Sequence, residues 1–221
     1  MNFGRRGFLA GALAAAIAGR ARAEDFRRRV PFRAGRSDLD SGMACARMAM
    51  SFFEPREHFP VADLQEMTAH DGDHWFFEPQ LVPIMRQKGR KAELFSDLDY
   101  AAIAAGKGMD VFGPGAVKMI DRPALRWAMG KGVVRQPAQD LSVLLERFRA
   151  GGFLMIVADR GILRRDPALP FCRFHLAVTG FSDNVVRVHD PVRGPNLELP
   201  HALVAAAFGH PASGRSALLI V

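Results

Sequence analysis

Helix signals and strand signals fall in different parts of this 221-residue chain. Apolar side chains recur at three- and four-residue steps from residue 41 to residue 53, which predicts a helix with one buried stripe. The continuous apolar run Phe153–Val157 predicts a strand that is buried on both faces. Because helices gather early and strands late, without alternating βα units, we expect an α+β fold.

The remaining elements follow from the same periodicities and from turn residues between them. Helices are expected over residues 61–69, 79–87, 97–105, 121–129, 141–150 and 200–208. Strands are expected over residues 91–95, 174–181, 185–190, 197–199 and 216–221. The glycine-rich stretch 106–120 is predicted to be an irregular surface loop over a cleft.

Composition and charge exclude several classes of protein. With 49% hydrophobic and 24% charged residues, the chain is expected to form one globular domain. It has no stretch of roughly 18 apolar residues, so no membrane-spanning helix is expected. The formal net charge is +7, but four arginines lie within residues 1–23, and the remainder carries only a small surplus. Such a surplus does not predict a nucleic-acid partner.

The first 23 residues have the features of a secretory signal. Arg5 and Arg6 precede Phe8 and Leu9, an alanine-rich apolar run follows, and a small-x-small cleavage site ends at Ala23. These features predict a twin-arginine signal in residues 1–23, a mature domain in residues 24–221, and a periplasmic or secreted location. The alternative is a basic amphipathic helix that stays attached to the domain.

A predicted hairpin places a histidine beside a carboxylate. If Phe181 faces Asn184 across the turn, His175 faces Asp190, and the two side chains share one face of the sheet. A carboxylate beside an imidazole fixes its tautomer and stabilises the imidazolium, as nucleophilic catalysis requires. A structural role for such a pair is the alternative. His189 is expected on the other face, as a surface residue.

Several segments together resemble the C39-like branch of the papain-like cysteine peptidases. The resemblance is carried by Asp40–Cys45, His175–Phe181 and Val186–Pro191, and it continues through Glu78–Pro83, Phe95–Tyr100 and Gly194–Leu197. It therefore spans nearly the whole mature chain, and the order and spacing of the segments make it specific. It implies a papain-like fold in which an N-terminal helical lobe packs on a C-terminal antiparallel sheet.

The resemblance also assigns roles to individual residues. It implies that Ser41 occupies the position of the nucleophilic cysteine, that His175 is the base and that Asp190 is the orienting acid. The family has a glutamine about six residues before the nucleophile, whereas this sequence reads Ala34-Gly35-Arg36 there. The residues expected to contact a substrate are Arg36, Asp40, Gly42 and Trp75.

Serine in place of cysteine changes the chemistry. A helix N-terminus and an imidazolium can hold a cysteine as thiolate at neutral pH, but a serine alkoxide is too basic to persist. Loss of an oxyanion donor costs on the order of 3 kcal/mol in the transition state. We therefore expect an exported homologue without cysteine-peptidase activity that binds a peptide or peptide-like ligand in the ancestral cleft.

Two other interpretations stay open. Ser41, His175 and Asp190 could form a working triad of an amide or ester hydrolase or an acyltransferase. Alternatively, Ser41 could be an engineered replacement of a cysteine that silences a genuine protease.

Cys45 lies one helical turn beyond the nucleophile position and is interpreted as a core thiol. Whether Cys45 and Cys172 form a disulfide is not decided by their spacing.

Four residues between the second predicted helix and an aromatic run could bind a metal. His70, Asp71, Asp73 and His74 are close in sequence but lack a regular ligand spacing, and they precede Trp75-Phe76-Phe77. A loop whose aromatic residues line a groove is the preferred interpretation. We therefore expect neither a metal nor another cofactor.

Overall fold

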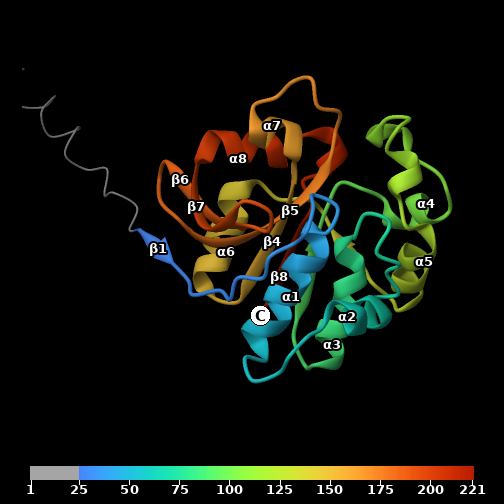
Figure 1. Ribbon diagram of the computed structural model, residues 1–221, viewed down its shortest axis with the longest axis horizontal. Helices are drawn as coiled ribbons and strands as arrows, with labels where there is room; N and C mark the ends of the chain where they lie inside the picture. Colours follow the sequence, from blue (N-terminus) through green and yellow to red (C-terminus); the bar gives the residue numbers. More distant parts are fainter. Residues whose placement is uncertain (1–24) are drawn as a thin grey trace, which may run out of the picture.

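A mixed β-sheet organises residues 25–221, the part of the chain that this computed structural model describes (Figure 1). The strands are β1 (Phe26–Arg27), β2 (Ala92–Phe95), β3 (Arg135–Gln136), β4 (Phe153–Asp159), β5 (Arg173–Phe181), β6 (Val185–Asp190), β7 (Gly194–Pro200) and β8 (Ala217–Ile220). Their order is β3-β2-β8-β4-β5-β6-β7, and β1 pairs with β5. The predicted signal, residues 1–23, lies outside the described residues.

Helices fill the connections between these strands. They are α1 (Ser41–Phe53), α2 (Val61–Thr68), α3 (Leu81–Gln87), α4 (Tyr100–Ala104), α5 (Arg122–Gly130), α6 (Leu141–Ala150), α7 (Arg160–Arg164) and α8 (His201–Phe208). Short 3-10 turns are η1 (Glu78–Gln80), η2 (Asp110–Phe112), η3 (Val117–Met119) and η4 (Pro211–Ser213). None of the helices among the described residues has the length and apolar character that a bilayer crossing needs.

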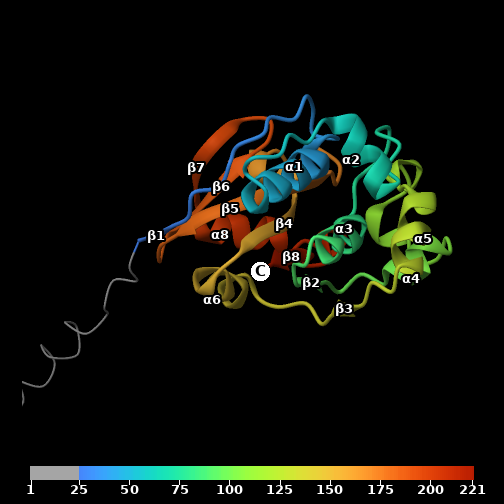
Figure 2. The same ribbon diagram turned by 90° about the horizontal axis from the view of Figure 1, so that it is seen from below.

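The sheet carries helices on both faces (Figure 2). Phe153 and Met155 of β4 pack with α1 and α3 on one face, whereas Leu154 and Ile156 pack with α6 and α8 on the other. This alternation explains why β4 reads as a continuous apolar run, because both of its faces are buried. His175 of β5 points to the α1 side of the sheet, where its imidazole meets the helical half of the chain.

The α+β class and the helical lobe packed on a sheet are confirmed, with differences in detail. The sheet also recruits β2 from the first half of the chain, and β2 pairs with β3 in parallel. The segment after β4 also forms α7, which the sequence analysis did not predict, and the Asp159 side chain caps this helix by accepting a hydrogen bond from the Gly161 N–H. Within the expected loop 106–120, η2 and η3 form two short turns.

The β5–β6 hairpin forms, but its predicted register is wrong. Ala177 faces His189 and Val178 faces Val188, and the register then shifts so that Gly180 faces Arg187. The irregularity at Thr179 lies where β1 runs against β5, and a Cβ on Gly180 would lie within 2.3 Å of the Phe26 carbonyl oxygen. A β-bulge of this kind adds one residue to one strand. His175 and Asp190 are consequently not cross-strand partners.

Candidate functional site

The start of α1 meets the start of β5, as the resemblance implies. Ser41 is the first residue of α1, and its Oγ accepts a hydrogen bond from the backbone N–H of His175 at 3.2 Å. Ser41 is 1% exposed and His175 is 2% exposed. The serine hydroxyl therefore satisfies a buried backbone donor of β5, which needs a partner once it is away from water.

Glu78 supplies the carboxylate that faces the imidazole. Its Oε1 lies 2.6 Å from Nε2 of His175. Its Oε2 accepts hydrogen bonds from Arg173 at 2.6 Å and from the Tyr100 hydroxyl at 2.8 Å. Because an ionised carboxylate only accepts hydrogen bonds, Nε2 of His175 carries the proton. Within residues 25–221, Nδ1 of His175 has no hydrogen-bond partner.

Burial and charge set the protonation states of this cluster. Burial raises the pKa of the Glu78 carboxyl, but Arg173 and the hydrogen bond from His175 outweigh it, and the pKa falls to about 2. Burial lowers the pKa of His175, with the Glu78 carboxylate opposing the shift. Burial, and then Glu78, raises the pKa of Tyr100. At neutral pH the cluster therefore holds an ionised Glu78 and a neutral His175.

Asp190, the predicted orienting acid, is bonded elsewhere. Its Oδ2 accepts a hydrogen bond from Arg160 at 2.7 Å, and its Oδ1 accepts from the backbone N–H groups of Val192 and Arg193. The register shift moves it away from the position opposite His175. In this geometry Asp190 closes the turn after β6 and neutralises the buried Arg160.

His189, expected at the surface, is buried. It is 2% exposed, its Nε2 donates to the Val30 carbonyl, and its Nδ1 accepts from the Asn196 N–H. The expectation of a surface residue is wrong because the segment before α1 covers this part of the sheet (Figure 2). Both ring nitrogens are satisfied by backbone groups, so the side chain has a structural role.

Phe76 covers the contact between α1 and β5. Phe76 is 1% exposed, and its ring centroid lies 6.2 Å from that of His175. A Cβ placed on Gly42 would lie 2.6 Å from the Phe76 Cβ and 3.0 Å from Cε1 of His175. Gly42 therefore allows Phe76 to pack directly on α1. Water and a peptide substrate are excluded from Ser41 and His175 in this arrangement.

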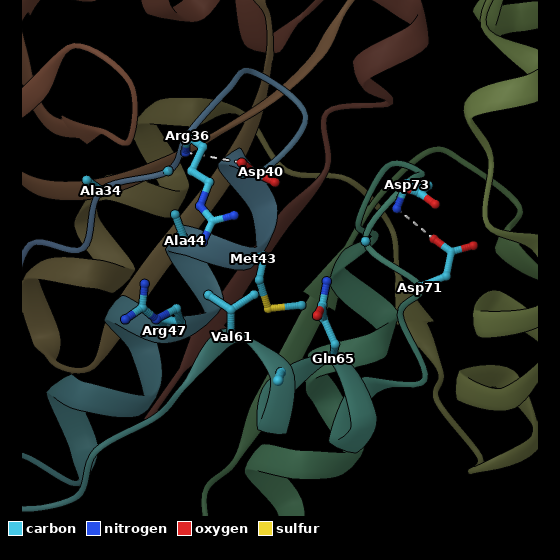
Figure 3. Close-up of a pocket in the computed structure, with 13 residues that line it drawn as sticks. Ala34, Arg36, Asp40, Met43, Ala44, Arg47, Val61, Gln65, Asp71 and Asp73 are labelled. Atoms are coloured by element: carbon cyan, nitrogen blue, oxygen red, sulfur yellow. Dashed lines mark hydrogen bonds between the residues drawn. The ribbon is translucent and has the colours of Figure 1, made fainter.

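An open groove lies on the neighbouring face of α1 (Figure 3). Its volume is about 460 Å³. Figure 3 shows Arg36, Asp40 and Arg47 on the α1 side, and Gln65 and Asp71 across the groove. The side chains of Met43 and Val61 also line it. The groove thus combines apolar side chains with cationic groups on the α1 side and carboxylates on both sides.

The four predicted substrate contacts lie in two different environments. Arg36 and Asp40 line the groove, and Asp40 accepts a hydrogen bond from the Arg36 N–H at 3.1 Å. Gly42 lies beneath Phe76 instead. Trp75 is 5% exposed and packs edge-on against Phe112 and Phe171. Only Arg36 and Asp40 are therefore positioned for a ligand in this groove.

Both cysteines are free thiols. Cys45 is buried on the same face of α1 as Ser41, and burial, followed by the negative charge of Asp190, raises its pKa well above the ordinary value. Burial raises the pKa of Cys172 to about 11. Neither thiol is activated as a nucleophile, because nucleophilic attack requires the thiolate.

The role of Glu78 was not predicted, although the sequence contains a signal for it. Glu78 is a single carboxylate within the otherwise apolar or neutral run Trp75–Met85. A charged side chain in a buried segment needs a charged or hydrogen-bonding partner. The sequence does not identify that partner, because Arg173 and His175 lie almost one hundred residues away and reach Glu78 only through the fold.

Comparisons with solved structures identify the fold. A crystal structure assigned as a C39-like peptidase from Bacillus anthracis matches with a TM-score of 0.54 and 12% identity, covering 90% of this chain and 98% of that chain. The domain therefore has the fold of C39-like peptidases.

Two further crystal structures match at lower TM-scores. The peptidase domain of Streptococcus ComA, a bifunctional ABC transporter, matches with a TM-score of 0.48, 10% identity and coverage of 87% and 98%. A double-glycine-motif protease from an AMS/PCAT transporter, solved with a leader peptide, matches with a TM-score of 0.49, 12% identity and coverage of 90% and 96%. No family model and no curated protein sequence matches the chain.

Proposed function

We propose that this chain is an exported member of the C39-like peptidase family that lacks peptidase activity and binds a peptide or peptide-like ligand. The observation that carries the proposal is the closed centre. Ser41 bonds to the His175 backbone, both residues are buried, and Phe76 packs against the His175 ring and Gly42. A nucleophile must contact both its base and its substrate, and Ser41 contacts neither a ring nitrogen nor the solvent.

The groove beside α1 is the proposed ligand site. The guanidinium of Arg36 has no ion-pair or hydrogen-bond partner among residues 25–221, so it is free to bind a carboxylate or a peptide carbonyl. Asp71 and Asp73 lie on the other side of the groove and can accept hydrogen bonds from an amine or backbone N–H groups. This distribution of charge suits a peptide, which carries donors and acceptors along its whole length.

Export is the second part of the proposal. Arg5, Arg6 and the small-x-small site ending at Ala23 support twin-arginine export followed by cleavage before Glu24. N-terminal sequencing of the exported protein tests it, with Arg5→Lys and Arg6→Lys combined in one variant. We expect a mature chain that begins at Glu24 and retention of the variant in the cell. Equal export of both chains would contradict this part.

Binding and hydrolysis can be tested in one experiment. The mature chain is equilibrated by dialysis against a randomised hexapeptide pool, and bound and free peptides are identified by mass spectrometry. We expect a subset of intact peptides to be enriched, with no fragments. Arg36→Glu should reduce the enrichment at least tenfold, whereas the matched variant Arg56→Glu, at an exposed position outside the groove, should not.

Three results would overturn the proposal. If neither Arg36→Glu nor Arg56→Glu changes the enrichment, the groove is not the ligand site. If no peptide is enriched at all, the groove is likewise not a peptide site. Fragments that disappear in Ser41→Ala or His175→Ala would establish a peptidase.

A second function is supported by one observation. The Glu78–His175 pair leaves Nδ1 of the imidazole unbonded, and an oriented imidazole with one unbonded nitrogen is the base that a serine hydrolase needs. In that case Glu78, rather than Asp190, would orient the base in a triad with Ser41 and His175. This alternative requires Phe76 to move away from Gly42 and His175, and labelling of Ser41 distinguishes it from the first proposal.

A further inference from the structure

The loop after α2 is held against the start of α5. Trp75 and Ile120 form an isolated parallel β-bridge, and the Trp75 N–H donates to the Met119 carbonyl at 2.7 Å. This contact brings residues 70–74 beside Asp121, which caps α5 through a hydrogen bond from Ala124 N–H to its Oδ1. Two segments that are some fifty residues apart in sequence thus meet through their backbones.

Two buried polar atoms face each other at this contact. Nδ1 of His70 lies 3.4 Å from Oδ2 of Asp121, and each side chain is 3% exposed. Within the described part of the chain, neither atom has a hydrogen-bond partner. Buried polar atoms that lack a hydrogen bond are uncommon in folded proteins and require an explanation.

A third ligand atom completes the cluster. His70, Asp71 and Asp121 offer ligand atoms that all lie within 4.8 Å of one another. Asp71 is held by its neighbours, because its Oδ1 accepts from the Asp73 N–H and its Oδ2 lies 2.6 Å from Nδ1 of His74. Partners of this kind orient the ligands of metal sites.

The separation of the two buried atoms fits ligands of one metal ion. Two ligands bound tetrahedrally to Zn²⁺ at about 2.1 Å lie about 3.4 Å apart, the separation between His70 Nδ1 and Asp121 Oδ2. Imidazole and carboxylate are both zinc ligands, and three protein ligands leave one position for water or another molecule.

We propose that His70, Asp71 and Asp121 form a binding site for one divalent transition-metal ion such as Zn²⁺. This site joins the end of α2 to the start of α5 and borders the groove, which Asp71 also lines. The competing explanation is a simple ion pair between a protonated His70 and Asp121, in which Asp71 plays no part.

Cobalt substitution tests the site without any assay of activity. The tag-free chain is treated with chelator and titrated with Co²⁺ and then with Zn²⁺, and visible absorption and thermal unfolding are recorded. We expect one Co²⁺ per chain with the intense bands of tetrahedral coordination and no thiolate charge-transfer band. Zn²⁺ should displace Co²⁺ and raise the unfolding midpoint, because an ion that binds only the folded state stabilises it.

Conservative variants distinguish the metal site from the ion pair. Asp121→Asn keeps a cap acceptor for α5, and Asp71→Asn is an exchange at an exposed position, so it is expected to fold. Each of the three variants Asp121→Asn, Asp71→Asn and His70→Gln should weaken Co²⁺ binding at least tenfold. Asp63→Asn and His58→Gln, at exposed positions, serve as controls. No stoichiometric binding, or binding that Asp71→Asn leaves unchanged, would overturn the proposal.

Discussion

Ser41 acts in this fold as a hydrogen-bond acceptor for the backbone of β5. Its Oγ is the partner of the His175 N–H, and both groups are shielded from water. A catalytic nucleophile would instead present its oxygen to the imidazole and the substrate. The resemblance to C39-like peptidases therefore predicted the position of this residue, while its bonding partner depends on the register of β5, which the sequence did not reveal.

Ser41→Ala tests this structural role. Removing the hydroxyl leaves the buried His175 N–H without an acceptor, so we expect the free energy of unfolding to fall by about 1–3 kcal/mol. Chemical denaturation gives the value, and Ser142→Ala on the exposed side of α6 is the control, expected to change little. An unchanged or increased stability would contradict this role, since replacing strained catalytic residues commonly stabilises an enzyme.

Glu78 contributes stability that depends on pH. Its pKa is about 2 in the folded chain, below the ordinary value of 4.5. The unfolded chain therefore binds the proton first, and the contribution is fully present above about pH 4.5 and is lost as the pH falls toward 2. Converted at about 1.4 kcal/mol per pKa unit, the shift is worth about 3 kcal/mol.

Glu78→Gln tests both the charge and its pH dependence. At neutral pH we expect a loss of about 3–5 kcal/mol, because the buried Arg173 loses its counter-charge. The difference between the parent chain and Glu78→Gln should shrink as the pH falls from 5 toward 2. Urea unfolding across this range measures it, with the exposed Glu66→Gln as control. A difference that is constant with pH would contradict the assignment.

At the scale of elements, periodicity predicted the helices well and the sheet less completely. The bounds of α1 and α6 agree with prediction because each carries a clear apolar stripe. β1 and β3 are two residues long, too short to show any period, and α7 follows from the capping of Gly161 N–H by Asp159. The bulge at Thr179 depends on contact with β1, which no local pattern records.

The packing of α1 under Phe76 makes its second residue sensitive to size. Gly42→Ala would place a Cβ within 3.0 Å of both Phe76 and His175, so we expect a loss of about 1–3 kcal/mol. Gly130→Ala, at the end of α5 with nothing within 4 Å, should instead be neutral or stabilising by up to about 1 kcal/mol. Thermal unfolding compares the two. Equal effects would show that Phe76 does not press on α1.

Across the whole molecule, the sequence motifs predicted the architecture but not which acid faces the imidazole. The α1–β5 contact between Ser41 and His175 follows from the order of the motifs along the chain. The choice between Glu78 and Asp190 follows from packing, because Arg160 binds Asp190 while Arg173 and Tyr100 hold Glu78. A C39-like peptidase fold thus surrounds a centre whose polar groups bond to one another.

Labelling with a fluorophosphonate tests the closed centre most directly. Only an activated, accessible serine reacts quickly with this probe, and intact-protein mass spectrometry detects the adduct. We expect the folded mature chain to keep its mass under conditions that label an active serine protease completely. Rapid addition of one probe per chain, abolished by Ser41→Ala, would contradict the account and establish a working serine nucleophile.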